Sequence, residues 1–305
     1  MNIRGLLGAV AMLFFAHDCD KTVVYYDLLE EETSGMKLRA LPASATGKVG
    51  LVAEETLKEL SRIAEEVPVI CVSGARASTM MTRQSMFPMV SYWICENGGR
   101  VFKTSEDGKE MVEDVEYVAY VQKMVTKGQW EALNSFAEDL EQEGWKVDRN
   151  GYETMIRVSR GSKSNEDSMN VEDLVPRIPH ELTHTYNLGY LDVQVPGLGK
   201  MRSVKWLCNK VAAGQESEYI FFGDDDNDIE AANEALETFV ANPRSEAMQL
   251  WIDSTTRTSG RERPQTVTIP PLEANGHAGA VFILKQVRAT IGRLRLGEAR
   301  NQEEL

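Results

Sequence analysis

Five short apolar runs recur along the chain, and they constrain its fold more than any other feature. They cover residues 9–16, 67–72, 90–95, 219–222 and 238–241. A continuous apolar run of this length, bounded by turn residues, is typical of a strand buried on both faces of a parallel sheet. Apolar residues at helical spacing lie between them, at 52–66 and 203–213. Strands that alternate with helices in this way predict an α/β protein with a parallel sheet.

The middle of the chain follows a different pattern. A helical stretch at 130–143 leads into an alternating strand at 152–159 and then into a polar loop at 160–173. This indicates an α+β unit inserted into the parallel-sheet core. We therefore expect three segments, namely 1–108 as the first part of the core, 109–190 as the insertion and 191–305 as the second part of the core.

The N-terminal apolar run can be interpreted in two ways. Residues 5–16 follow Arg4 and are similar to the apolar region of a secretory signal peptide. They are too few to cross a membrane as a helix, and no other stretch resembles a transmembrane segment. We favour a buried strand, because a motif of paired carboxylates follows the run directly.

Charge and cysteine content narrow the functional class. The chain has 305 residues and a formal net charge of −14, which argues against nucleic-acid binding. Its four cysteines are Cys19, Cys71, Cys95 and Cys208, and no C-x-x-C pair occurs among them. They are interpreted as reduced, buried thiols, which predicts a cytoplasmic location.

The first chemically informative segment follows the first apolar run. Asp18 and Asp20 flank Cys19 at the carboxyl end of the expected strand, where α/β sheets bind their ligands. Two carboxylates so close together repel each other, and a divalent cation would relieve that repulsion. The alternative is a solvated turn or a helix cap.

Two further segments carry groups suited to phosphate. Ser73 and Gly74 follow the second apolar run, and a hydroxyl beside turn N–H groups suits an anion, although an ordinary helix cap would look the same. Lys200 precedes the helical stretch at 203–213 and could neutralise a phosphoryl oxygen, although a surface lysine is the simpler interpretation. The segment is not a Walker A loop, because Gln194 and Met201 occupy two of its required positions.

A fourth segment, Gly223-Asp224-Asp225-Asp226-Asn227-Asp228, follows the run at 219–222. Several carboxylates at the end of a buried strand suit a hard cation with oxygen ligands. The alternative is an acidic helix N-terminus that complements the helix dipole. A calcium-binding loop is excluded, because the later bidentate Glu is absent.

In this order, the four segments resemble the motifs of the haloacid dehalogenase (HAD) superfamily, which are D-x-D-x-T/V, Ser or Thr, Lys, and G-D-x-x-x-D. The insertion resembles that family's C2-type cap, and the stretches at 95–99, 185–206, 240–243 and 276–286 resemble the type IIB sucrose-phosphatase-like and Cof-like phosphohydrolases. The resemblance implies a Rossmann-like parallel-sheet core with an α+β cap. His17, Lys21 and Met201 depart from the family pattern, which bears on substrate and rate more than on reaction class.

The resemblance also implies roles for the motif residues. Asp18 would attack phosphorus, Asp20 would act as general acid and base, and Ser73 with Lys200 would stabilise charge on the transferred group. Mg²⁺ would be held by Asp18, the carbonyl of Asp20, Asp224 and Asp228. Possible substrate contacts are Gly74, Asn97 and Asn227.

The expected activity is that of a magnesium-dependent phosphatase acting on a phosphate monoester, a sugar phosphate by resemblance. The partner is a small phosphorylated molecule, with no nucleic acid and no membrane, and the protein is expected to be a monomer or small homo-oligomer. Alternatives of the same fold are a phosphotransferase or mutase and a non-catalytic sugar-phosphate sensor.

One competing motif remains. His180, Glu181 and His184 match the H-E-x-x-H signature of zinc peptidases. That signature requires a helix, whereas here Pro179 and Gly189 flank the motif closely. A zinc peptidase is therefore the least favoured alternative.

Overall fold

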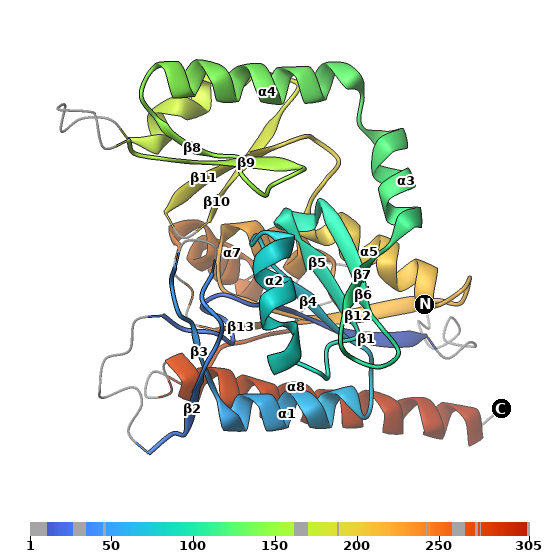
Figure 1. Ribbon diagram of the computed structural model, residues 1–305. Helices are drawn as coiled ribbons and strands as arrows, with labels where there is room; N and C mark the ends of the chain where they lie inside the picture. Colours follow the sequence, from blue (N-terminus) through green and yellow to red (C-terminus); the bar gives the residue numbers. More distant parts are fainter. Residues whose placement is uncertain are drawn as a thin grey trace.

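The computed structural model describes residues 11–26, 35–44, 47–161, 170–187, 189–241, 243, 245–257, 266–271, 274 and 276–303. Its largest element is an eight-stranded sheet with the order β14-β13-β12-β1-β4-β5-β6-β7 (Figure 1). These strands are β1 (Met12–Asp18), β4 (Val69–Val72), β5 (Tyr92–Cys95), β6 (Arg100–Thr104), β7 (Met111–Glu113), β12 (Ser217–Gly223), β13 (Glu237–Val240) and β14 (Thr266–Thr268).

The predicted parallel sheet is confirmed. Strands β14, β13, β12, β1, β4 and β5 pair in parallel, and only β6 and β7 join antiparallel at one edge. All five predicted runs contain strand residues, although Ala9 and Val10 lie outside the described residues. The first strand continues past the apolar run to Asp18, because its pairing with β4 holds Asp18 beside Val72.

Helices cover both faces of this sheet, which explains why its strands are continuously apolar. Phe14 and Ala16 of β1 share one hydrophobic core with Leu207 of α5 (Lys200–Val211). Phe15, between them, lies in a second core with Leu60 of α1 (Glu54–Ala64). Figure 1 shows α1 and α8 (Gly276–Glu303) side by side beneath the sheet.

The remaining elements are shorter or belong to the insertion. The α-helices are α2 (Ala77–Arg83), α3 (Val115–Met124), α4 (Lys127–Gln142), α6 (Ile229–Glu234) and α7 (Glu246–Arg257). The 3₁₀ helices are η3 (Gln84–Met86), η4 (Glu96–Gly98), η5 (Val171–Arg177) and η6 (Asp226–Asp228). Two short strands, β2 (Leu38–Ala40) and β3 (Leu51–Ala53), form an antiparallel pair of their own.

A second, antiparallel sheet has the order β10-β11-β9-β8, and α4 packs over it at the top of Figure 1. Its strands are β8 (Lys146–Asp148), β9 (Met155–Ser159), β10 (Thr183–Asn187) and β11 (Tyr190–Gln194). The chain leaves the large sheet after β7 and leaves the small sheet after β11, a few residues beyond the predicted limits at 108 and 190. Those limits remain a prediction.

The H-E-x-x-H segment does not form the helix that a zinc peptidase needs. His180 and Glu181 lie in a turn, and His184 lies on strand β10. The side chain of His180 is 93 % exposed. A turn followed by a strand does not place both histidines on one face, so the segment lacks the geometry of a zinc-peptidase site.

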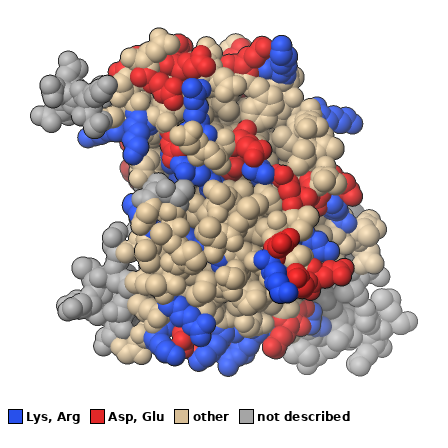
Figure 2. All heavy atoms as spheres, viewed as in Figure 1, with Lys and Arg blue, Asp and Glu red and all other residues tan. Residues whose placement is uncertain are grey.

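On the face of the molecule that Figure 2 shows, charged side chains lie in small groups. On the face in Figure 2, basic and acidic side chains lie interspersed. Within the part of the chain that the structure describes, no helix has the length and apolar character needed to cross a membrane.

Candidate active site

Three of the four motif segments meet because their strands are neighbours. Strand β1 lies between β12 and β4 and runs parallel to both. Asp18 ends β1, Ser73 follows the end of β4, and Asp224 follows the end of β12. The carboxyl ends of adjacent parallel strands form the edge at which α/β sheets bind ligands.

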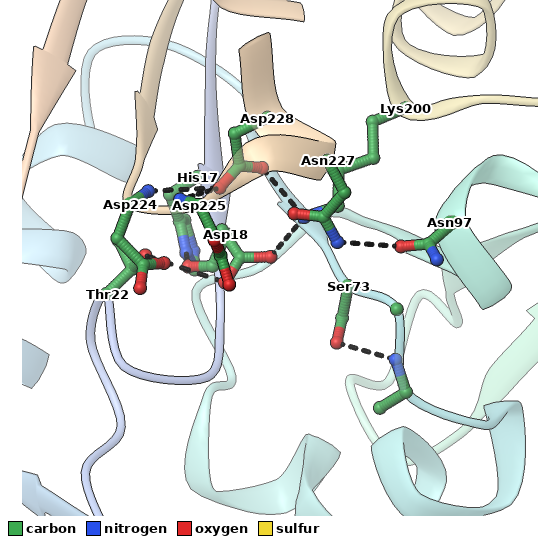
Figure 3. Close-up of polar contacts among 12 residues, drawn as sticks. His17, Asp18, Thr22, Ser73, Asn97, Lys200, Asp224, Asp225, Asn227 and Asp228 are labelled. Atoms are coloured by element: carbon green, nitrogen blue, oxygen red, sulfur yellow. Dashed lines mark hydrogen bonds and ion pairs between the residues drawn. The ribbon is translucent and has the colours of Figure 1, made fainter. Parts of the chain in front are cut away.

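Lys200 completes this group from the first turn of α5. Its Nζ lies 2.6 Å from Oδ1 of Asp18 and 2.7 Å from Oδ1 of Asp228, so it bridges the two carboxylates (Figure 3). All three side chains are buried. The predicted position of the lysine, just before the helix, is corrected by one turn, because the helix already begins at Lys200.

The acidic loop is shaped by its own last residue. Oδ2 of Asp228 accepts hydrogen bonds from the backbone N–H groups of Asp224, at 3.0 Å, and Asp225, at 3.3 Å. A Cβ at Gly223 would lie 2.6 Å from the same oxygen, so the loop requires glycine there. Thr22 Oγ1 donates to Oδ1 of Asp224 at 2.7 Å, which ties the loop to the segment after β1.

The site carries more negative than positive charge. Burial raises the pKa of Asp18 and of Asp224 well above the ordinary value, although Lys200 opposes the rise at Asp18. Burial alone would lower the pKa of Lys200, but Asp18 and Asp228 outweigh it and raise that pKa. Among the described residues, the ammonium group of Lys200 therefore pairs with Asp18 and Asp228, while Asp224 accepts a hydrogen bond from the neutral hydroxyl of Thr22.

This donor set suits a cation. One carboxylate oxygen from each of Asp18, Asp224 and Asp228 lies within 4.8 Å of the other two. Oxygen ligands with excess negative charge, taken out of water, are what a hard divalent ion neutralises best. The buried acidic cluster could therefore hold a metal ion.

Asp20 does not point into this cluster. Its Oδ1 accepts hydrogen bonds from Arg83 Nη1, at 3.0 Å, and from the hydroxyl of Tyr26. The structure thus brings Asp18, Lys200, Asp224 and Asp228 together and places the Asp20 carboxylate beside an arginine. The sequence motifs gave no indication of Arg83 or Tyr26.

Ser73 lies at the end of β4 and is almost completely buried. Its Oγ accepts the backbone N–H of Ala75 at 3.0 Å, which shapes the turn beside Gly74 (Figure 3). The carbonyl of Gly74 accepts a hydrogen bond from Arg157 of β9 at 3.3 Å. The small sheet therefore reaches down to the loop that carries Ser73.

The side chains of Asn97 and Asn227 are hydrogen-bonded to each other. Asn227 Nδ2 donates to Oδ1 of Asn97 at 3.0 Å, and Asn97 Nδ2 donates to Asp192 of β11 at 2.9 Å. Arg157 binds both oxygens of Asp192 at 2.6 Å. This polar chain links the acidic loop to the small sheet, and sequence analysis missed Arg157 and Asp192 because isolated charges on a strand carry no motif.

Two departures from the HAD pattern have local explanations. Lys21 adopts a φ of 67°, a left-handed conformation in which glycine is unstrained. His17 is buried with its Nδ1 2.7 Å from the carbonyl of Asp18. Burial lowers the pKa of His17 to about 4, so the ring is neutral at physiological pH.

The turn that carries Asn97 also fixes the small sheet. The buried carboxylate of Glu96 accepts hydrogen bonds from the N–H groups of Glu153 and Thr154 and from the Thr154 hydroxyl. Gly98, at φ +96°, lies against the first turn of α5, where a Cβ would fall 2.3 Å from the carbonyl oxygen of Gly199.

We therefore expect Gly98→Ala to lower the free energy of unfolding by about 2–4 kcal/mol, so that the variant unfolds at a lower denaturant concentration. The added Cβ combines backbone strain with steric overlap at Gly199, the residue before Lys200. Gly108→Ala is the matched control, since Gly108 also has a positive φ of 72° but no atom within 4 Å of the added Cβ. Urea denaturation measures both variants. Equal losses would show that contact with Gly199 is unimportant.

No protein-family model matches the sequence, and no curated protein matches it significantly. Solved structures do match. The sucrose-phosphatase from Synechocystis sp. PCC6803, solved with sucrose and phosphate, has a TM-score of 0.57 at 12% identity, covering 91% of this chain and 98% of that one. A HAD subclass IIB sugar phosphatase has a TM-score of 0.56 at 13% identity, covering 91% and 99%.

A third similar structure is from Thermoplasma acidophilum, with a TM-score of 0.54 at 12% identity, covering 90% of this chain and 98% of that one. At these identities the likeness establishes the fold. The chain has the α/β fold of the HAD-superfamily phosphatases, with a Rossmann-like parallel-sheet core and an inserted α+β unit.

Proposed function

We propose that this protein is a Mg²⁺-dependent phosphatase that hydrolyses a phosphate monoester, a sugar phosphate, through a phosphoryl group carried on Asp18. The observation that carries the proposal is the buried group of Asp18, Asp224, Asp228 and Lys200 at the carboxyl edge of the sheet. The shared fold supports it, since two of the similar structures are a sucrose-phosphatase and a sugar phosphatase.

In this proposal, an oxygen of Asp18 attacks phosphorus and the ester oxygen departs with the bonding electron pair. Asp20 gives its proton to that oxygen and later takes one from the water that cleaves the aspartyl-phosphate. Ser73 and Lys200 would stabilise charge on the oxygens of the transferred group. The balance is one ester and one water consumed, one alcohol and one phosphate released.

Mg²⁺ would be held by Asp18, Asp224, Asp228 and the backbone carbonyl of Asp20, and when bound it supplies positive charge for the transferred phosphoryl oxygens. The residues fit such an ion because, within the described residues, three buried carboxylates lie close together and Lys200 pairs with two of them.

Magnesium should therefore stabilise the folded protein independently of activity. At about one hundred times its dissociation constant, Mg²⁺ adds about 3 kcal/mol and raises the melting temperature by roughly 4 °C. Differential scanning calorimetry of chelator-treated protein, with and without MgCl₂, measures this shift. Asp224→Asn should remove most of it, and an unchanged shift in that variant would place the ion elsewhere.

The activity is tested by screening phosphorylated sugars and polyols for magnesium-dependent release of inorganic phosphate, with Asp18→Asn as the control. Product analysis decides between two outcomes of the same chemistry. Free phosphate supports the phosphatase, and phosphate moved to a second sugar position or acceptor identifies a phosphotransferase or mutase.

Four buried free cysteines support a reducing, cytoplasmic location for the enzyme.

A further inference from the structure

Arg83 is a fully buried arginine whose side-chain hydrogen bonds, among the described residues, go to Asp20 and to Tyr26 beside it. It is the last residue of α2, and its side chain is 0 % exposed. Nη1 donates to Oδ1 of Asp20 at 3.0 Å, and Nη2 donates to the hydroxyl of Tyr26 at 2.8 Å. The Tyr26 hydroxyl donates to the same oxygen of Asp20, which closes a triangle of three side chains.

The burial of Arg83 makes its pairing with Asp20 energetically necessary. A buried guanidinium is strongly destabilising unless a carboxylate compensates it, and within the described residues Asp20 is its only ion-pair partner. Burial alone would lower the pKa of Arg83, but Cys19, Asp20 and Tyr26 outweigh it and raise that pKa. Burial also raises the pKa of Tyr26, and the charge of Asp20 raises it further, so the phenol remains a donor.

The two donors bind the same oxygen of Asp20. Both hydrogen bonds fall on Oδ1, and Oδ2 accepts none from the residues that the structure describes. The Asp20 side chain is 16 % exposed, so this carboxylate is not sealed off. A carboxyl group held by one oxygen can present the other in a fixed direction, which is what proton transfer to a departing oxygen requires.

We propose that Arg83 and Tyr26 are positioning residues: their hydrogen bonds hold Oδ1 of Asp20 and orient its Oδ2 toward the ester oxygen of the substrate. The inference rests on the proposed phosphatase activity and deepens it. In the first step, Asp20 starts protonated on Oδ2 and donates that proton to the ester oxygen as the P–O ester bond breaks and the bond to Asp18 forms, which leaves the Asp20 carboxylate paired with Arg83. In the second step, Oδ2 accepts a proton from the water that attacks phosphorus as the bond between phosphorus and Asp18 breaks, and inorganic phosphate leaves.

The experiment compares two aryl phosphates, 4-nitrophenyl phosphate and phenyl phosphate, which differ by one nitro group. The 4-nitrophenolate ion leaves readily without a proton, whereas phenolate is more basic and depends more on the general acid. We expect Arg83→Met to lower kcat/KM for phenyl phosphate by about 10²-fold, at the lower end of general acid–base effects, and for 4-nitrophenyl phosphate by less than about tenfold. Arg83→Lys should restore part of the difference.

Tyr26→Phe serves as a second variant, because it removes one hydroxyl and leaves the buried ion pair in place. It should change the ratio of the two substrates in the same direction by a smaller factor. Arg62→Met is the matched control, since Arg62 forms an ion pair with Glu59 on α1, outside the site. It should leave the ratio unchanged, and thermal melting should show whether each variant is folded.

A cycle with Asp20→Asn distinguishes positioning from a general structural role. If Arg83 acts through Asp20, then Arg83→Met should change the substrate ratio little once Asp20 is replaced. Equal losses on both substrates, or an undiminished effect in the Asp20→Asn background, would overturn the inference. Wild-type protein that releases no phosphate from either aryl ester, nor from any sugar or polyol phosphate in the screen, would instead overturn the proposed function.

Discussion

Replacing Asp18 by Asn is expected to reduce phosphate release by about four orders of magnitude or more, the scale on which loss of a catalytic nucleophile acts. An amide nitrogen or oxygen does not form the aspartyl-phosphate, and Asn has nearly the shape of Asp. The fold should survive, because Lys200 keeps Asp228 as its partner. Removing one of three crowded negative charges should leave the melting temperature equal or higher.

Phosphate release from the best ester found in the screen, together with a melting curve, measures both parts of this prediction. Asp107→Asn is a suitable control, because Asp107 lies in an exposed turn between β6 and β7. It should retain full activity. A folded Asp18→Asn protein with wild-type turnover would require a different nucleophile.

Lys200→Met is expected to lower the free energy of unfolding of the metal-free protein by about 3–5 kcal/mol, the largest stability loss among the variants named here. It leaves two buried carboxylates without their shared counter-ion. Lys200 is 1 % exposed and contacts both Asp18 and Asp228. Lys205→Met is the matched control on the same helix. Its partner is Glu234, both side chains are about half exposed, and such pairs contribute less than about 1 kcal/mol.

The loss should depend on pH in a defined direction. Burial raises the folded-state pKa of Asp18 above its unfolded value, so the folded state binds a proton more readily than the unfolded state. Protonation relieves the uncompensated charge, so the deficit of Lys200→Met should be smaller near about pH 5 than near about pH 8. Urea denaturation in chelator at both pH values measures this, and equal small losses for the two lysine variants would contradict it.

The architecture of the core was predictable because it rests on burial. A strand covered on both faces must be apolar at every position, so the runs at 67–72 and 219–222 were visible in the sequence. Strand β6 and the edge strands β7 and β14 were missed. The two edge strands have only three residues each, and β6 and β7 contain exposed or half-buried positions that interrupt the apolar pattern. Periodicity also placed the start of the helix at 130, whereas the Thr126 cap begins α4 at Lys127.

The site was predictable only where residues belong to a contiguous motif. Asp18, Asp224 and Asp228 were found because each follows a recognisable strand. Arg83 was not, because its partner Asp20 is 63 residues away and nothing in α2 indicates their contact. Arg157 and Asp192 were missed for the same reason, since pairing between β9 and β11 brings them together. Long-range pairing of single charges has no local pattern.

The position of β1 at the centre of the sheet has a consequence for biosynthesis. Its pairing with β4 can form early, but β12 is made only after the whole insertion, and Thr22 and Asp224, which share a hydrogen bond, are 202 residues apart. Until β12 has been synthesised, the backbone N–H and C=O groups along one edge of β1 have no native hydrogen-bonding partner. Such an edge is a template for association with other chains, so a chain stalled or cleaved within the insertion should be prone to aggregate.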